Sequence, residues 1–246
     1  MITKVLIILA AFFAFGAIMI RCSHCLRKTR AEQQRTDWIK YGVYLAVITT
    51  LLLACWSSWW TTALVCAAIA MAGAHELYRH LSTRKSRSIV YAVLFAGVLA
   101  TCLGHILLTE PGSFSSSFTF MLLMVATTDS FSQLWGKLLG RNKLCPRLSP
   151  GKTIEGLIGG ILTALAAVYL FGFLMPTLSI RQLALAAIVI ALSATVGDLL
   201  FSSIKRKLKT KDFSRALPGH GGILDRFDSL IVTAPVFYWT RVFWLN

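Results

Sequence analysis

Residues 183–206 read LALAAIVIALSATVGDLLFSSIKR, an apolar run in which Asp198 is the only charge before Lys205 and Arg206. At a rise of about 1.5 Å per residue, about 20 apolar residues in a helix cross the roughly 30 Å hydrocarbon core of a bilayer. The stretch therefore predicts a transmembrane helix that leads into a basic segment. An ionisable side chain inside such a helix is costly and is usually functional, which draws attention to Asp198.

The composition of the whole chain agrees with a membrane protein. Of its 246 residues, 56% are hydrophobic and 14% are charged, whereas soluble domains carry about 25% charged residues. The apolar content excludes a disordered chain, and six Cys spread over this length exclude a disulfide scaffold. The net charge is +15, and the basic residues lie between the apolar runs. We therefore expect anionic lipid or phosphate as the partner and no nucleic acid.

Eight apolar runs predict the fold class: an all-α, polytopic integral membrane protein with about eight transmembrane helices in a single domain, residues 1–246. For the second and third runs an interfacial hairpin is the alternative, because only a tight turn separates them. Gly159 and Gly160 suit close helix packing in lipid. The runs lie near residues 2–20, 41–56, 60–78, 89–108, 118–136, 156–175, 183–203 and 229–246.

The distribution of Lys and Arg predicts the orientation. Four alternate connections, residues 21–40, 79–88, 137–155 and 204–228, hold 22 of the 25 basic residues. Because cytoplasmic loops are enriched in Lys and Arg, these four segments should face the cytoplasm and both termini should lie outside. We expect a multi-pass protein, in the inner (plasma) membrane for a bacterial chain; an organelle membrane would show the same pattern.

The acidic residues gather on the same side. Apart from Glu110, all of them fall in the basic segments or in the cytoplasmic halves of the runs, including Glu76, Asp129 and Asp198. Each acid alone has a Lys or Arg partner as its simplest explanation. For carboxylates that converge from four elements, a hydrated cavity with metal or proton chemistry is favoured.

The segment 204–228 is the densest in charge. Asp198, Ser202 and Lys205 recur at i, i+4 and i+7, and Asp225 and Asp228 would share one helical face. Glycines beside them would let the backbone approach phosphate oxygens closely. Oxygen ligands next to several cations fit Mg²⁺ that holds a polyphosphate. The segment contains Lys205, Arg206, Lys211, Gly219, His220, Gly221, Gly222, Asp225, Arg226 and Asp228.

A second stretch predicts another phosphate-binding wall. Ser149 and Pro150 predict a turn, and Thr153 with Glu155 predicts the start of a helix. The N–H groups at that helix start, together with Lys152, suit an anion.

At these residues the chain resembles the phosphatidate cytidylyltransferase (CDP-diacylglycerol synthase) family. Residues 202–228, SSIKRKLKTKDFSRALPGHGGILDRFD, match the signature of that family without a gap. Further blocks match in order at Asp129, at Ser149 to Gly156 and at Gly197 to Leu199, and Glu76 matches more weakly. The resemblance implies a catalytic core in residues 116–246, preceded by variable helices in residues 1–115.

The resemblance implies transfer of a cytidylyl group from CTP to phosphatidate, which gives CDP-diacylglycerol and pyrophosphate in phospholipid biosynthesis. It implies CTP, phosphatidate and the bilayer as partners and leaves a homodimer open. The residues it assigns to catalysis are Asp198, Lys205, Arg206, His220, Asp225, Arg226 and Asp228. Mg²⁺ would bind Asp198, Asp225 and Asp228, with a second ion left open. Substrate binding falls to Asp129, Ser149, Lys152, Thr153, Ser202, Lys211, Gly221 and Gly222.

Several alternatives remain open. Asp129 precedes residues 130–133, Ser-Phe-Ser-Gln, where the family usually has a Gly-Ala-Tyr type of stretch, so a paralogue that acts on another lipid phosphate is one alternative. A CTP-dependent lipid kinase is another. A transporter is disfavoured because the outer halves of the runs are almost free of charge, and a CDP-alcohol phosphotransferase because its acidic pattern does not occur. For His220, a structural role is as open as a hydrogen bond to pyrophosphate.

Overall fold

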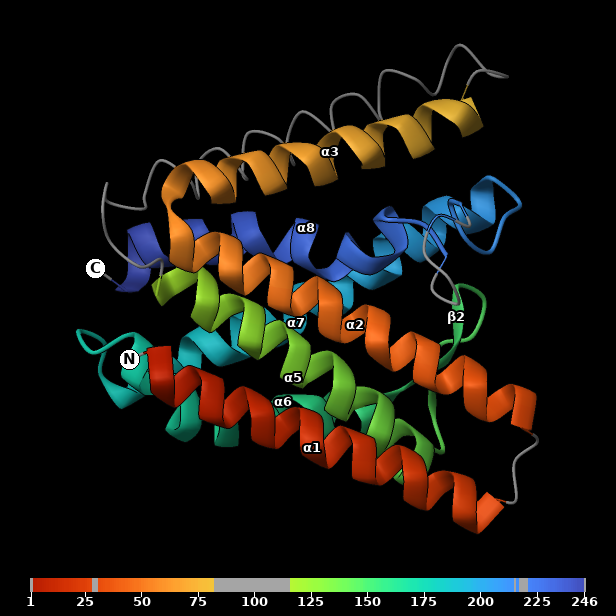
Figure 1. Ribbon diagram of the computed structural model, residues 1–246, viewed down its shortest axis with the longest axis horizontal. Coiled ribbons are helices and arrows are strands. Elements are labelled where there is room, and N and C mark those ends of the chain that lie inside the picture. The colour runs from red at the N-terminus through yellow and green to blue at the C-terminus, as the bar shows by residue number, and fades with distance from the viewer. Residues whose placement is uncertain (1, 28–30, 82–115, 215, 217–220, 246) are drawn as a thin grey trace.

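The computed structural model describes residues 2–27, 31–81, 116–214, 216 and 221–245 and is mostly helical (Figure 1). Its elements are α1 (Ile2–Arg27), α2 (Ala31–Ser57), α3 (Trp59–Leu81), α5 (Ser116–Leu139), β1 (Lys143–Cys145), β2 (Ser149–Thr153), α6 (Ile154–Phe171), the 3-10 turn η1 (Gly172–Leu174), α7 (Ile180–Lys207), α8 (Leu224–Thr240) and the π-helical turn η2 (Arg241–Leu245).

Within the described ranges, four helical stretches are long and apolar enough to cross a membrane: Ile2–Cys22, Ala31–Ser57, Ile154–Leu174 and Ile180–Lys207. Helices also cover the predicted runs near residues 60–78, 118–136 and 229–246. The run predicted at residues 89–108 lies outside the described residues. A mostly helical fold with four candidate membrane spans is thus confirmed, and the count of eight spans stays a prediction.

The long helices run back and forth between two ends of a bundle (Figure 1). The N-terminus of α1 and the end of α8 with η2 lie at one end. The opposite end holds the end of α1, the start of α2, the β1–β2 hairpin and the residues that follow α7, 208–214. The described parts of the charged segments singled out above therefore share one end of the molecule.

Helix α5 lies at the centre and packs most extensively on α6. It is buried nearly all round from Phe118 to Thr128, as expected for a helix that is surrounded by others. Where α5 crosses α6, a Cβ at Gly159 would overlap the Trp135 indole. Trp135 also donates a hydrogen bond to Thr163 across the crossing (Nε1 to Oγ1, 3.0 Å). The predicted packing role of Gly159 is confirmed.

Two features differ from the sequence-based expectation. The chain is not entirely α-helical, because β1 and β2 form an antiparallel hairpin in which Lys143 pairs with Thr153 and Cys145 with Ser149. The segment 21–40, expected to be a loop, is helical in its described residues, 21–27 and 31–40. Hydropathy marks where apolar side chains stop, but a helix continues as long as its backbone hydrogen bonds do.

Candidate active site

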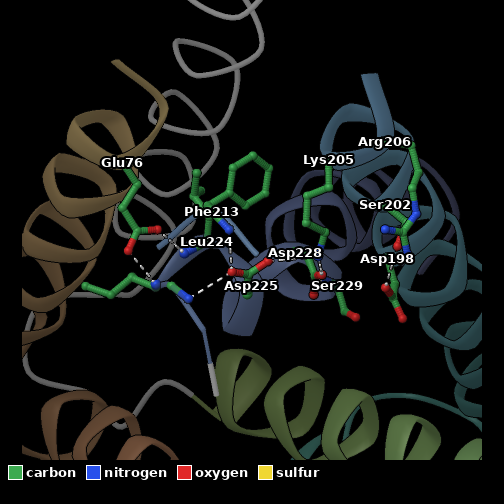
Figure 2. Close-up of polar contacts among 12 residues, drawn as sticks. Glu76, Asp198, Ser202, Lys205, Arg206, Phe213, Leu224, Asp225, Asp228 and Ser229 are labelled. Atoms are coloured by element: carbon green, nitrogen blue, oxygen red, sulfur yellow. Dashed lines mark hydrogen bonds and ion pairs between the residues drawn. The ribbon is translucent and has the colours of Figure 1, made fainter. Parts of the chain in front are cut away.

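The face of α7 that was predicted to carry an acid, a hydroxyl and a cation is present. The Ser202 hydroxyl donates to Asp198 Oδ1 (3.5 Å), and Lys205, one turn further on, reaches across to α8. Figure 2 shows these side chains in a row that runs from Asp198 through Asp228 and Asp225 towards Glu76. The i, i+4, i+7 spacing on α7 is therefore realised as one polar face. We call this face, together with Asp228, Asp225 and Glu76, the polar strip.

Lys205 joins α7 to the first turn of α8. Its Nζ lies 2.8 Å from Asp225 Oδ1 and 3.8 Å from Asp228 Oδ2. The Lys205 side chain is 12% exposed and that of Asp225 is 2% exposed. The two acids lie on one face of α8, as their spacing predicted, and a single buried ammonium serves both.

The second oxygen of Asp225 organises the chain that precedes α8. Asp225 Oδ2 accepts hydrogen bonds from the backbone N–H groups of Phe213 and Gly222, each at 2.8 Å. The segment is thereby tied to the start of α8 from within. Both carboxylate oxygens of Asp225 have partners, which satisfies a buried charge.

The sequence marks Glu76 as an acid in the cytoplasmic half of the third run and as a weaker match to the family, and the structure gives it a definite place. From α3 it accepts hydrogen bonds from the Ser214 hydroxyl (2.5 Å) and from the N–H groups of Ile223 (2.8 Å) and Leu224 (3.0 Å). The partners lie up to 148 residues away in sequence, so no local pattern predicts these contacts.

The hairpin and the start of α6 close the other side of the strip. Lys152 in β2 forms an ion pair with Asp198 (Nζ to Oδ2, 2.6 Å), in which the two side chains are 25% and 32% exposed. Arg206 donates through Nε to the backbone oxygen of Leu148 (3.3 Å). The two stretches predicted to bind phosphate thus touch each other.

Two further predicted substrate-binding residues of this stretch lie in β2, Ser149 at its start and Thr153 at its end. The Thr153 hydroxyl is buried and caps α6 by accepting from the N–H of Gly156 (3.1 Å). Ser149 lies in β2 opposite Cys145. Thr153 therefore fixes the start of α6 directly after Lys152, a role that its N-cap position predicts.

Asp129 on α5 adds a further carboxylate to the strip. It is half-buried, lies next to the Ser229 hydroxyl and is within electrostatic reach of Lys152, Asp198 and Arg226. Asp228 is likewise within reach of both Asp129 and Asp198. Carboxylates from α5, α7 and α8 therefore lie within electrostatic range of one another, as the sequence predicted for acids of separate elements.

The remaining predicted residues lie at the surface of the strip or outside the described residues. Lys211 and Arg226 are exposed, and Gly221 adopts a positive φ of 82°. His220 and Gly219 lie outside the described residues. The exposed cations remain accessible to a ligand from solution.

The donor types at the site fit a hard divalent ion. Across the residues that the structure describes, no three His, Cys, Asp or Glu side chains converge into a metal-binding cluster. Among the described residues, Asp198 contacts Lys152 and Ser202, and Asp228 contacts Lys205 and the Ser229 N–H, which leaves carboxylate oxygens of both with spare acceptor capacity. Mg²⁺ is usually held by one or two carboxylates together with substrate phosphates, so the site suits an ion that arrives with a polyphosphate.

Comparison with known proteins identifies the class. The chain matches the Cytidylyltransferase family over residues 1–244 and belongs to that family. It is 42% identical over 118 residues to the phosphatidate cytidylyltransferase of Staphylococcus haemolyticus, an overlap of 48% of this chain and 45% of the relative.

Two other relatives show a similar overlap. The phosphatidate cytidylyltransferase of Rickettsia bellii is 41% identical over 130 residues, which are 50% of this chain and 56% of the relative. A protein of Escherichia coli named YnbB is 48% identical over 120 residues, which are 49% of this chain and 40% of that protein. The chain spans about half the length of the curated relatives it matches.

Proposed function

We propose that this chain transfers a cytidylyl group from CTP to phosphatidate and releases CDP-diacylglycerol and pyrophosphate. The observation that carries the proposal is the polar strip, in which Lys152 and Lys205 each pair with a carboxylate of a family block. Family membership and the names of the relatives support the same reaction.

The reaction requires that the charges of the lipid phosphate and CTP are neutralised and that the two are aligned; it does not require a protein nucleophile. An ionised phosphate oxygen of the lipid attacks the α-phosphorus of CTP. The bond between the α-phosphorus and the oxygen that bridges it to the β-phosphorus breaks, and pyrophosphate leaves with that oxygen. Two polyanions that repel each other must meet in line, so positioned cations lower the barrier.

The residues of this chain divide that work. A polyphosphate would offer Lys152 and Lys205 new anionic partners, and the exposed Arg206, Lys211 and Arg226 would add positive charge around it. The backbone turn at Gly221 and Gly222 is tied to Asp225, the partner of Lys205. Mg²⁺, if held by Asp198 and Asp228, would supply further neutralisation of the phosphates. Asp225, also expected from the sequence to bind the ion, has both oxygens engaged by Lys205 and by two backbone N–H groups.

The site would lie at the cytoplasmic face of a bacterial inner membrane. The basic ends of the helices gather at the hairpin end of the bundle (Figure 1), which the enrichment of cytoplasmic loops in Lys and Arg would place inside. Both termini would then lie outside, and eight spans would require one near residues 89–108. An alkaline phosphatase fusion at the C-terminus should be active, and a green fluorescent protein fusion should be dark.

The central test is product formation by detergent-purified protein with CTP, phosphatidate and Mg²⁺. We expect CDP-lipid and pyrophosphate, and none from Asp198→Asn. Asp198 is the sharper probe because its side chain is 32% exposed, whereas Asp225 is part of a buried pair. Glu32→Gln, an exposed carboxylate in the first turn of α2, is the matched control and should retain activity.

Other products would redirect the assignment. Release of CDP in place of pyrophosphate would select a lipid kinase, in which attack falls on the γ-phosphorus. Turnover with a different lipid phosphate, but not with phosphatidate, would select a divergent paralogue. Absence of CTP binding by a folded protein would refute the proposal.

A further inference from the structure

The first turn of α8 is capped by a residue from another helix. Ile223, at the N-cap position, makes no capping hydrogen bond with its own side chain. Glu76 of α3 instead accepts the N–H groups of Ile223 and Leu224, at 2.8 and 3.0 Å. A carboxylate at this end of a helix satisfies donors that have no partner within the helix and is favoured by the helix dipole.

The same carboxylate explains one of the two adjacent glycines. A Cβ at Gly222 would lie 2.5 Å from Glu76 Oε2 and 2.8 Å from Oε1. Gly222 is therefore needed for the close approach of Glu76. Gly221 is needed for a different reason, because its backbone φ of 82° is one that residues with a side chain rarely adopt.

Two carboxylates hold the backbone of residues 222–224 from opposite sides. Asp225 accepts the N–H of Gly222, while Glu76 accepts the next two N–H groups along the chain (Figure 2). Glu76 also accepts the Ser214 hydroxyl in the segment before the turn. It is 6% exposed, and among the residues the structure describes no cation forms an ion pair with it.

We propose that Glu76 is a positioning residue: it anchors the turn at residues 221–224 and thereby sets the places of Asp225 and Asp228 in the strip. The inference rests on the proposed function for its effect on turnover. Asp225 directly follows Leu224 and contacts Lys205, so a shift of the anchored backbone moves the acids and the ammonium together. A misplacement of about 1 Å near reacting groups costs about 100-fold in rate.

The test compares Glu76→Gln with Thr62→Val, another buried polar residue of α3. Gln keeps the size of Glu but turns an NH2 group towards backbone donors. Thr62 donates to the backbone oxygens of Ala54 and Ser58, each at 3.1 Å, and lies about 20 Å along the helix from Glu76. Its replacement weakens α3 without touching the turn.

Three quantities are measured on the purified full chain: the unfolding midpoint, backbone hydrogen exchange in residues 209–226, and kcat with KM for CTP. Loss of charge-assisted hydrogen bonds in Glu76→Gln should speed exchange at Ile223 and Leu224 by about tenfold or more. We expect kcat to fall by about 10- to 100-fold, with KM changed less than about threefold. Glu76→Asp should recover part of the rate.

Thr62→Val should lower the unfolding midpoint while leaving kcat and exchange in the turn unchanged. The positioning role is refuted if Glu76→Gln retains wild-type kcat, or if Thr62→Val reduces kcat to the same extent for the same loss of stability. Should the wild-type chain form no product, the proposed reaction fails by itself. Hydrogen exchange then decides whether Glu76 anchors the turn, and unchanged exchange in Glu76→Gln would refute that.

Discussion

Replacement of Lys205 by Met tests whether the buried ion pair holds α7 and α8 together. Met keeps the length of the aliphatic stem and its contact with the Phe213 ring, over which the ammonium lies at 5.6 Å. What is lost is the charge that serves Asp225 at 2.8 Å and Asp228 at 3.8 Å. The two acids are then left without their cation in a nearly closed environment.

The expected loss follows from burial. The side chains of Lys205, Asp225 and Asp228 are 12%, 2% and 11% exposed, so solvent screening is weak. Removal of one partner from a buried pair costs about 3–5 kcal/mol, because the remaining charge is uncompensated. We therefore expect Lys205→Met to lower the free energy of unfolding by an amount in this range.

A double-mutant cycle with Asp225→Asn separates the pair from its surroundings. In the single variant the Asn oxygen retains the N–H groups of Phe213 and Gly222, but its NH2 group faces the Lys205 ammonium, donor against donor. In the double variant that conflict is gone. The double loss should therefore be smaller than the sum of the single losses by about 1.5 kcal/mol or more.

Reversible unfolding in mixed micelles of a mild detergent and sodium dodecyl sulfate, followed by tryptophan fluorescence, measures all four proteins. Lys205→Arg, which keeps the charge, is the matched control and should lose less than Lys205→Met. A Lys205→Met loss below about 1 kcal/mol, the value typical of exposed pairs, would show that the pair is screened. Strictly additive losses in the cycle would also contradict the reasoning.

Two substitutions of glycine extend the test to other parts of the fold. An alanine at Gly221 would need a φ of 82° and would place its Cβ 2.9 Å from Asp225 Oδ2, so Gly221→Ala should lower the free energy of unfolding by about 1–2 kcal/mol in the same titration. The control is Gly151→Ala, where a Cβ meets nothing within 4 Å, and it should cost less than about 0.5 kcal/mol. Equal losses for the two variants would contradict this reasoning. Gly159→Ala would overlap the Trp135 indole and should cost about 1–3 kcal/mol with a shift in tryptophan emission, whereas an unchanged spectrum and stability would mean that α6 moves aside freely.

The helices were predictable because their signal is local. An apolar run of sufficient length predicts a helix wherever it occurs, and Gly159 in such a run predicted a close crossing. The β1–β2 hairpin gave no comparable signal, because its strands have three and five residues and the second reads Ser-Pro-Gly-Lys-Thr. Strands of that length, with no alternation of apolar and polar residues, are specified by the elements they pack on.

The candidate site divides in the same way. Asp198, Ser202 and Lys205 were predictable as one face of α7, because a helix converts spacing in sequence into direction in space. The pairing of Lys152 with Asp198 and of Glu76 with the turn at residues 222–224 depends on how helices pack. The sequence singled out Gly222 for a close approach of phosphate oxygens. In the structure the group that a Cβ at Gly222 would meet is the carboxylate of Glu76, which comes from α3, far away in sequence.

The residues of the family blocks therefore have two roles, in the scaffold and in ligand binding, and a loss of activity alone does not distinguish them. Asp225 has both oxygens engaged by Lys205 and by two backbone N–H groups, and Thr153 is engaged by the start of α6. Their removal disturbs the scaffold before any ligand is considered. Asp198 and Lys152 are partly exposed and have one another as principal partners, so a ligand can replace those partners without unfolding the turn. Variants at these two positions report on substrate chemistry most directly.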